Sequence, residues 1–331
     1  MRTIALEEHF TVPELVHRID PARIVHRGFP PPNVPLGPMR EADRLADLGP
    51  ARLADMDAAG ITVQVLSVSG PGADLLPPDE GPALARDFND ALSRVVAAHP
   101  DRYAGFAHLP MTAPEAAADE LERAVRQLGF RGALINGLTE ERFLDDRCFA
   151  PILARAETLQ VPLYIHPGIP PAPVRNAYYN GLPEPLGFML SIAGWGWHAE
   201  TAVHVLRLVL SGTLDRYPRL QLIVGHMGEG LPAMLARCDQ VFGAATPRFL
   251  QRSVSQTILD QVHVTTSGLF TLPPFEVLLH TFGIDRILFS VDYPFSPNQR
   301  GRAFLDSLPL APADREKIAF GNADRLLRLN R

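Results

Sequence analysis

Acidic and imidazole side chains follow an apolar run at the start of the sequence. There, residues 4–6 lead directly into Glu7, Glu8 and His9. Alternate side chains of a strand share a face, so Glu7 and His9 point the same way and Glu8 points the other way. A carboxylate and an imidazole on one face can bind one metal ion. Such a short motif also occurs in an ordinary strand that ends in a polar turn, so it needs support from the rest of the chain.

Similar endings recur further along, where apolar segments stop at a titratable side chain. Residues 161–165 end at His166, and residues 287–290 lead into Asp292. If these segments are parallel strands of one barrel, their ends meet at the same face and their side chains converge. With the first pair they give two imidazoles and two carboxylates, a set that suits Zn²⁺, Mn²⁺ or Fe²⁺. A metal-free acid–base site and a merely polar barrel rim remain the alternatives.

A second histidine–carboxylate pair follows the apolar residues 220–224. His226 comes two residues after this segment, and Glu229 lies one turn further on. A carboxylate at that spacing orients and charges the ring, so we predict that the pair transfers protons. The alternatives for His226 are a further metal ligand and a packed core histidine. His108 is expected to be structural, and no function is assigned to the other histidines, which are His17, His26, His99, His198, His204, His263 and His280.

The segments that position these residues alternate between two patterns. Short runs rich in β-branched residues predict strands in the first ten residues and at 61–69, 103–109, 130–135, 161–165, 220–224, 262–266 and 287–290. Helices are predicted between them, at 51–60, 82–99, 114–128 (with Thr112 as N-cap), 149–160, 200–214, 231–241 and 274–280, and the tail at 301–329 predicts two or three short helices.

Eight strand–helix units predict an α/β protein with a (β/α)8 TIM barrel of the metal-dependent hydrolase type. The alternative, a doubly wound open sheet, lacks the Gly-x-Gly-x-x-Gly segment after the first strand. We predict one domain over residues 1–331, with an irregular Pro-rich N-terminal arm at 11–50. An irregular insertion at 169–197, after the fifth strand, is expected to cover the site.

Composition narrows the class of protein further. The chain has 331 residues, of which 46% are hydrophobic and 21% charged, and a net charge of −6. These values predict a globular protein with no nucleic-acid partner and no membrane partner. No basic and apolar leader segment begins the sequence, so a cytoplasmic location is expected. Two cysteines, Cys148 and Cys238, are too few for a disulfide framework or a Cys-based zinc site.

Four segments around these side chains carry a family pattern: 5–10 (ALEEHF), 165–167 (IHP), 225–232 (GHMGEGLP) and 289–295 (FSVDYPF). They resemble the metal-dependent decarboxylases of the amidohydrolase superfamily. That group includes the γ-resorcylate, 2,3-dihydroxybenzoate and salicylate decarboxylases and, more distantly, the aminocarboxymuconate semialdehyde decarboxylases. The resemblance runs nearly end to end, through 200–208 and 321–323. The segment 169–197 departs from the pattern, so the resemblance does not identify the substrate.

The resemblance implies a (β/α)8 barrel with one divalent metal, zinc or manganese, with zinc preferred. Two-metal members commonly bridge their ions with a carboxylated lysine after the fourth strand. Here that strand ends at Asn136, and the only lysine is Lys317, in the tail. A homodimer or homotetramer is expected, with the arm in its contacts. By motif, the metal ligands are Glu7, His9, His166 and Asp292, and the catalytic pair is His226 and Glu229, while Arg237 lies near the substrate.

The predicted reaction is nonoxidative decarboxylation of an ortho-hydroxy aromatic carboxylic acid. Asp292 would protonate the ring carbon, and His226 with Glu229 would polarise the hydroxyl. Phe295 and Trp195 are candidates to pack the ring. One alternative is a mononuclear hydrolase of lactones or amides, with Asp292 as base. The other is a barrel kept only for binding.

Overall fold

The computed structural model describes residues 1–29, 42–183 and 185–329. Eight parallel strands form two sheets, in the orders β1-β2-β3 and β4-β5-β6-β7-β8. A parallel bridge from Ala107 to Ala133 joins the sheets on one side, and the His9 amide donates to the Tyr293 carbonyl (2.7 Å) on the other. The fold is thus the predicted (β/α)8 barrel. The strands are β1 (Ile4–Phe10), β2 (Val63–Val68), β3 (Tyr103–Gly105), β4 (Ala133–Asn136), β5 (Leu163–His166), β6 (Leu222–Val224), β7 (Val262–Thr265) and β8 (Ile287–Leu288).

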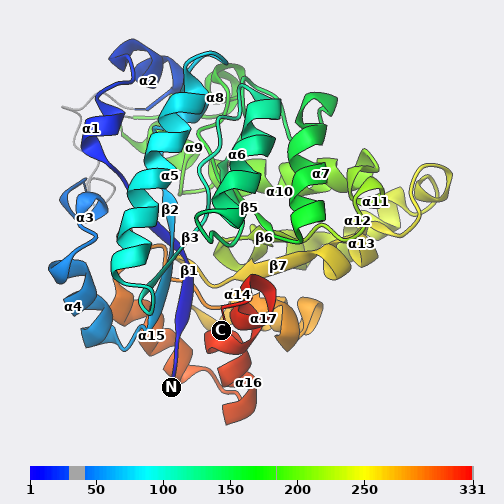
Figure 1. Cartoon of the computed structure of the whole chain (residues 1–331). Coiled ribbons are helices and arrows are strands. Elements are labelled where there is room, and N and C mark those ends of the chain that lie inside the picture. Colours follow the sequence, from blue (N-terminus) through cyan, green and yellow to red (C-terminus); the bar gives the residue numbers. More distant parts are fainter. Residues whose placement is uncertain (30–41, 184, 330–331) are drawn as a thin grey trace.

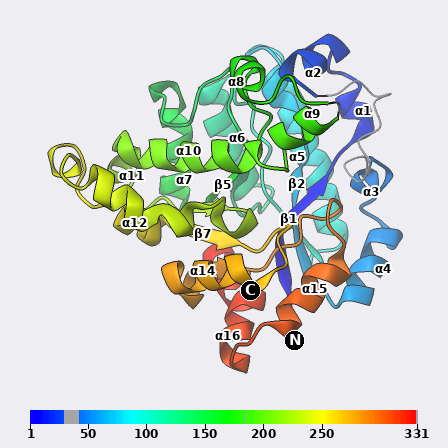
Figure 2. The same ribbon diagram turned by 180° about the vertical axis from the view of Figure 1, so that it is seen from behind.

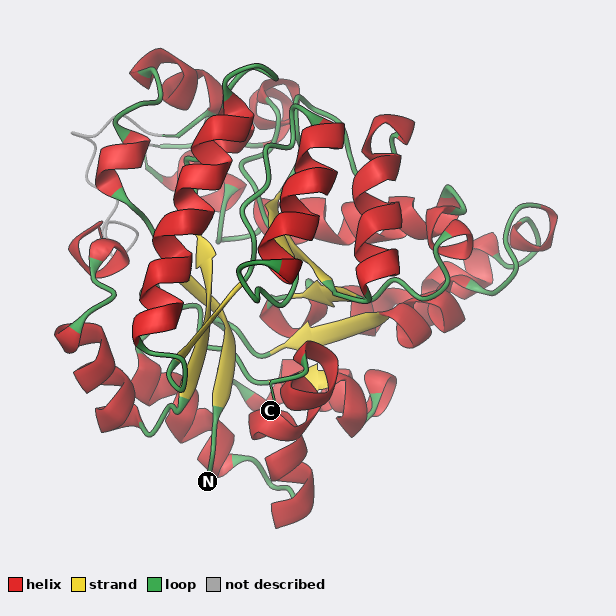
Figure 3. Cartoon of the chain, in the orientation of Figure 1, coloured by secondary structure: helices red, strands yellow, loops and turns green. Residues whose placement is uncertain are grey.

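Helices surround these strands (Figures 1, 2 and 3). One set of buried side chains fills the barrel, among them Leu6, Val65 and Tyr164, and a larger set packs the strands against the helices. No helix in the described ranges is long and apolar enough to cross a membrane. The longer helices are α4 (Pro50–Ala59), α5 (Gly81–Ala98), α6 (Pro114–Arg126), α7 (Ala150–Leu159), α10 (Gly196–Leu210), α12 (Leu231–Phe242), α13 (Val254–Gln261), α14 (Leu272–Phe282) and α15 (Asn298–Ser307).

A bulge in β1 sets which side chains face the barrel interior. Ala5 pairs with Gln64 and Glu8 with Leu66, so residues 6 and 7 together oppose Val65. Strict alternation from Leu6 would turn Glu8 inward. The extra residue instead turns Glu7 toward the interior and Glu8 into the barrel wall, as bulges beside functional sites commonly do.

Two segments expected to be irregular contain helices, so that prediction is wrong for them. The insertion 169–197 holds α8 (Ala172–Tyr178), α9 (Leu186–Ser191) and the first two residues of α10. The arm holds α1 (Pro13–Val16), α2 (Pro21–Arg27) and α3 (Ala42–Ala46), while its residues 30–41 lie outside the described ranges. Proline starts several of these helices, because its fixed φ suits the first turn.

Smaller differences concern helix ends and the tail. Ala113, not Thr112, is the N-cap of α6, and the Thr112 hydroxyl donates to the Leu76 carbonyl instead (2.7 Å). Helix α13 was not predicted. The tail after α15 holds α16 (Pro312–Glu316), a π-helical turn at 317–321 and α17 (Asn322–Leu327), which agrees with the expected short helices. The short α11 (Thr213–Arg216) follows α10.

Candidate metal centre

Five side chains from four strand ends meet at one end of the barrel. Glu7 and His9 come from β1, His166 is the last residue of β5, and His226 and Asp292 follow β6 and β8. Glu7 Oε1 lies 3.3 Å from His166 Nε2, and His9 Nε2 lies 3.2 Å from Asp292 Oδ1. His226 Nε2 is 3.8 Å from both Glu7 Oε1 and Asp292 Oδ2. The structure therefore brings together all four predicted ligands and the predicted proton-transfer histidine.

The donor atoms of this cluster fit a divalent metal ion. Ligand atoms of Glu7, His9 and His166 lie within 4.8 Å of one another, as do those of Glu7, His226 and Asp292. Glu7 Oε1 and His9 Nε2 are buried and have no hydrogen-bond partner among the residues that the structure describes. Leaving such atoms without a partner is costly in a protein interior, and a cation would satisfy both. Two carboxylates and neutral imidazoles are the donors that such ions take.

Hydroxyl groups fix the second oxygen of Glu7. Tyr164 on β5 and Ser267 after β7 both donate to Glu7 Oε2, and Thr265 Oγ1 lies 3.5 Å from it. These contacts leave Oε1 as the oxygen that faces the histidines. Burial raises the pKa of Glu7, while the charge of His226 opposes that shift. No sequence pattern pointed to these hydroxyls, because each belongs to a strand or loop far along the chain from Glu7.

The surroundings of the cluster keep His166 neutral and Asp292 ionised. Burial and the neighbouring His9 and His226 lower the pKa of His166 to about 3, so this ring is neutral, the form that binds a metal. Burial alone would raise the pKa of Asp292, but the nearby imidazoles of His226 and His9 hold it below its usual range. Asp292 is therefore a carboxylate in this site at neutral pH.

His226 is held by Glu229, and Glu229 by a residue that the sequence did not reveal. Glu229 Oε1 lies 2.9 Å from His226 Nδ1, and its Oε2 contacts Nδ1 of His198, at the start of α10. Burial would lower the pKa of His226, but the Glu7 and Glu229 carboxylates outweigh it and hold that pKa well above the usual value. No function was assigned to His198 from the sequence, in which it directly follows the segment 169–197.

The three predicted catalytic residues all have left-handed backbones. The φ angles are 47° at His226, 55° at Glu229 and 72° at Asp292. A non-glycine residue in this region costs roughly 1–3 kcal/mol and persists only where the surroundings hold it.

At Asp292 the neighbouring backbone is held by the buried Glu8. Glu8 Oε1 accepts from the Val291 amide (2.9 Å), and Oε2 accepts from the Tyr293 amide (3.1 Å). Glu8 thus points away from the cluster, as predicted, and its hydrogen bonds hold the backbone on both sides of Asp292. Burial raises the pKa of Glu8 to about 8, and the two amides and the nearby Arg52 oppose that shift.

A cavity of about 240 Å³ opens beside the cluster. His166, His226 and Asp292 line one part of it, together with Asn136 from the end of β4. Its other walls are mostly apolar and include Ile169, Phe188, Ile192, Trp197 and Phe295. The cavity therefore presents an apolar wall opposite a set of charged and imidazole groups, as small-molecule sites do.

Arg27, from the arm, brings a positive charge to this cavity. Its guanidinium donates to the carbonyl of Ile169, and Arg175 on α8 donates to the carbonyls of Arg27 (3.1 Å) and Pro170 (2.9 Å). The arm and the segment 169–197 therefore hold each other over the cavity. No sequence pattern had pointed to Arg27.

The three predicted substrate-binding residues have different positions. Phe295 lines the cavity, with its ring centroid 5.6 Å from that of His9. Trp195 does not line it and is 60% exposed; Trp197 occupies the wall instead. Arg237 lies on the exposed side of α12 and donates to Gln240 (2.9 Å). The structure therefore does not bring Arg237 or Trp195 to this cavity. His108 is structural, as expected, because its Nε2 accepts from the Ala73 amide (2.8 Å).

Comparisons with known proteins agree with this geometry. A model of the Amidohydrolase family matches residues 9–329. A γ-resorcylate decarboxylase of Rhizobium sp. is 39% identical, over 99% of this chain and 98% of that protein. Among solved structures, a 2,6-dihydroxybenzoate decarboxylase in complex with 2,6-dihydroxybenzoate has a TM-score of 0.88 and 37% identity, with both chains fully covered.

A second solved structure, a dihydroxybenzoic acid decarboxylase from Polaromonas sp. with bound manganese and the inhibitor 2-nitroresorcinol, has a TM-score of 0.88 and 36% identity. The alignment covers 99% of this chain and 97% of that one. The family match spans nearly the whole sequence and includes most of the predicted site residues. The chain therefore belongs to the amidohydrolase family.

Proposed function

We propose that this chain is a carbon–carbon lyase that removes carbon dioxide from an ortho-hydroxy benzoate. The observation that carries this proposal is the cavity of about 240 Å³ in which an apolar wall faces Asp292, His226 and His166. Its size suits a single substituted ring, and Arg27 offers a counter-charge for a carboxylate. The full-length similarity to γ-resorcylate decarboxylase supports the same substrate class.

One divalent ion belongs to this site, held by Glu7, His9, His166 and Asp292. When bound, it supplies a Lewis acid that withdraws electron density from anionic substrate oxygens. Both zinc and manganese fit two imidazoles and two carboxylates. The zinc preference stays a prediction, and the manganese in the Polaromonas neighbour supports manganese instead. Metal analysis of the purified protein decides between them.

Asp292 is the proposed proton donor to the ring. Its proton forms a new C–H bond at the carbon that carries the carboxylate. The C–C bond to the carboxylate then breaks, its electron pair returns to the ring, and carbon dioxide leaves. Because His226 and His9 hold the pKa of Asp292 low, Asp292 rests as a carboxylate and must take up a proton before it can donate one; once protonated, it is a strong acid, which suits protonation of carbon. One proton from solvent restores Asp292 for each turnover.

His226 is the proposed second catalytic residue. Its raised pKa keeps the ring positively charged, 3.8 Å from Asp292 Oδ2. A fixed positive charge at this place stabilises the electron-rich oxygen as the ring loses aromaticity. Glu229, oriented by His198, holds the His226 ring in place. In this proposal the whole chain works as one domain, since β1, β5, β6 and β8 all contribute to the site.

The proposed oligomer is a homodimer or homotetramer. Large apolar side chains are exposed on α9 and at the start of α10, including Leu186 (56%), Met189 (44%) and Trp195 (60%). Exposed apolar groups of this kind are typical of interfaces. Light scattering measures the oligomeric state directly, and a monomer at micromolar concentration contradicts this part of the proposal.

A direct assay tests the activity. The metal-loaded protein is incubated with 2,6-dihydroxybenzoate, 2,3-dihydroxybenzoate and salicylate, and ring product and carbon dioxide are measured. We expect the phenolic product of at least one acid, with no oxygen from ¹⁸O-water in it. Aromatic lactones and amides are assayed in parallel. Hydrolysis of these without release of carbon dioxide from any acid contradicts the proposal and favours the hydrolase.

A further inference from the structure

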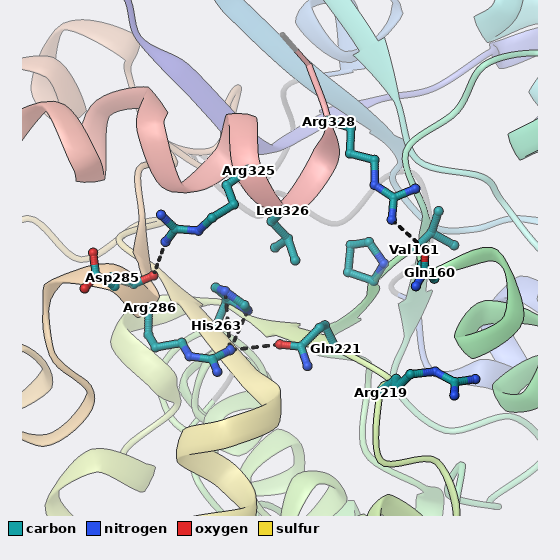
Figure 4. Close-up of a pocket in the computed structure, with 11 residues that line it drawn as sticks. Gln160, Val161, Arg219, Gln221, His263, Asp285, Arg286, Arg325, Leu326 and Arg328 are labelled. Atoms are coloured by element: carbon teal, nitrogen blue, oxygen red, sulfur yellow. Dashed lines mark hydrogen bonds between the residues drawn. The ribbon is translucent and has the colours of Figure 1, made fainter.

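A second cavity, of about 460 Å³, lies at the opposite end of the barrel from the metal centre. It is formed where strands begin: Val161 and Pro162 precede β5, Gln221 precedes β6 and Arg286 precedes β8. Helix α17 closes one side with Arg325 and Leu326 (Figure 4). The (β/α)8 architecture places the reaction at the other end, so this cavity has no part in the chemistry proposed above.

Four arginines line this second cavity: Arg219, Arg286, Arg325 and Arg328. They come from two strand starts and from the end of α17, and Figure 4 shows Arg286 and Arg325 on one side of the cavity and Arg219 and Arg328 on the other. The whole protein has a net charge of −6, so a cavity lined by four cations differs in sign of charge from the protein as a whole. Asp285 is the one acidic residue in the lining.

Three of the four cations of this cavity have no charged partner among the described residues. Arg286 donates to the side chain of Gln221 (2.8 Å), and Arg328 donates to that of Gln160 (2.9 Å). Arg325 donates to the backbone carbonyl of Asp285 (3.1 Å). All these acceptors are neutral, and among the described residues none of the three arginines forms an ion pair.

The carboxylates beside the cavity already have cationic partners, and Asp260, whose charge acts on Arg286, pairs with Arg252 (3.2 Å). The Asp285 carboxylate pairs with Lys317 (3.2 Å), and Glu157 pairs with Arg219 at 3.7 Å. The positive charges also act on one another and on their neighbours. Burial and the charges of Arg286 and Arg325 lower the pKa of His263 to about 3. Its ring is therefore neutral and contributes polar nitrogen atoms, but no charge, to the lining of the cavity. Like charges held together in this way favour binding of an anion.

We propose that this cavity binds a phosphate-type oxyanion and thereby ties α17 to the strand starts of the barrel. Guanidinium groups recognise phosphate through paired N–H donors, and three of the four arginines keep such donors without a charged acceptor. The volume is larger than one phosphate needs, so the phosphate group can belong to a larger metabolite or be free in solution. The site is independent of the proposed decarboxylase activity.

The test is a titration of the metal-loaded protein with inorganic phosphate by calorimetry, at constant ionic strength. The variant is Arg325→Gln/Arg328→Gln, which removes two charges of the cavity. The control is Arg94→Gln, an exposed arginine on α5. We expect one phosphate per chain in the wild type and the control, and at least tenfold weaker binding in the double variant. No binding to the wild type, or equal affinity in all three proteins, overturns the proposal.

Two further arms complete the test. If the double variant does not fold, Arg328→Gln replaces it, because among the described residues the Arg328 guanidinium donates only to Gln160; an unchanged affinity there also overturns the proposal. Adenosine monophosphate and glucose 6-phosphate are titrated beside inorganic phosphate. Tighter binding of either one supports the site and identifies a phosphorylated metabolite, and tighter binding of phosphate supports it as a site for the free ion.

Discussion

Replacing Glu8 with glutamine is expected to slow the reaction although Glu8 faces away from the reacting groups. The Glu8 carboxylate accepts from the amides of Val291 and Tyr293, on either side of Asp292. Glutamine has nearly the same shape but only one acceptor oxygen. Its NH₂ group must then face one of the two amides, which leaves a buried N–H without a partner.

The magnitude follows from these contacts. An unsatisfied buried donor costs about 1–3 kcal/mol. The left-handed backbone of Asp292 has a similar conformational cost, roughly 1–3 kcal/mol. Loss of one of the two hydrogen bonds to Glu8 is therefore enough for this backbone to leave the left-handed conformation. If displacement of Asp292 adds about 2 kcal/mol of that cost to the activation free energy, kcat falls about 30-fold, since 1.36 kcal/mol is a factor of ten.

The assay compares kcat, bound metal and urea unfolding for Glu8→Gln and a matched control. Glu120→Gln is that control: Glu120 is buried too, and binds Asn89 and Arg123 on the outer helices. Both variants should lose stability, and only Glu8→Gln should lose kcat. An unchanged kcat in folded, metal-loaded Glu8→Gln would refute the reasoning, as would a loss that excess metal fully restores.

Three further variants test the site and its cover. Asp292→Asn should abolish turnover while the circular dichroism spectrum stays unchanged, and near-normal turnover would remove Asp292 from the chemistry. His226→Asn should lower kcat by about 10²–10⁴ at an unchanged metal content; a KM effect alone would make it a binding residue. Glu200→Gln concerns stability: burial raises the pKa of Glu200 to about 7, although Arg27 and Arg175 oppose that shift. A raised carboxyl pKa stabilises the fold below pH 4.5, and that contribution is lost as the pH rises through 7. The variant should therefore be more stable than the wild type at pH 8.5, by up to about 3 kcal/mol, and the difference should shrink toward pH 5 in urea unfolding. A constant difference at both pH values would contradict the assigned pKa.

The barrel could be predicted well from the sequence because the pattern that indicates each strand lies within a few consecutive residues. Each buried strand is a short β-branched run, and each polar ending stands at its end, so bringing these endings to one face of the barrel required only the parallel order of strands. The relatives confirm the fold and the decarboxylase chemistry.

What could not be predicted depends on contacts between distant segments. The bulge that turns Glu7 inward is a feature of the β1–β2 pairing. His198 reaches Glu229 only because α10 starts beside the turn after β6, and Trp197 replaces Trp195 for the same reason. The helix α8 was missed because its proline was interpreted as a loop residue rather than as a first-turn residue, and α9 because it directly follows a proline, Pro185, at its N-cap.

The position of Lys317 determines where this enzyme can be attached to a support. It is the only lysine in the sequence, and its side chain is 41% exposed at the strand-start end of the barrel, beside the arginine-lined cavity. The hydrogen bond to Asp285 raises the pKa of Lys317, so amine-reactive reagents require alkaline conditions. With the α-amino group of the chain blocked beforehand, acylation of this single ε-amine would fix every molecule by the same end and leave the substrate cavity facing the solution. It would also free the Asp285 carboxylate, so attachment should weaken phosphate binding while leaving turnover unchanged.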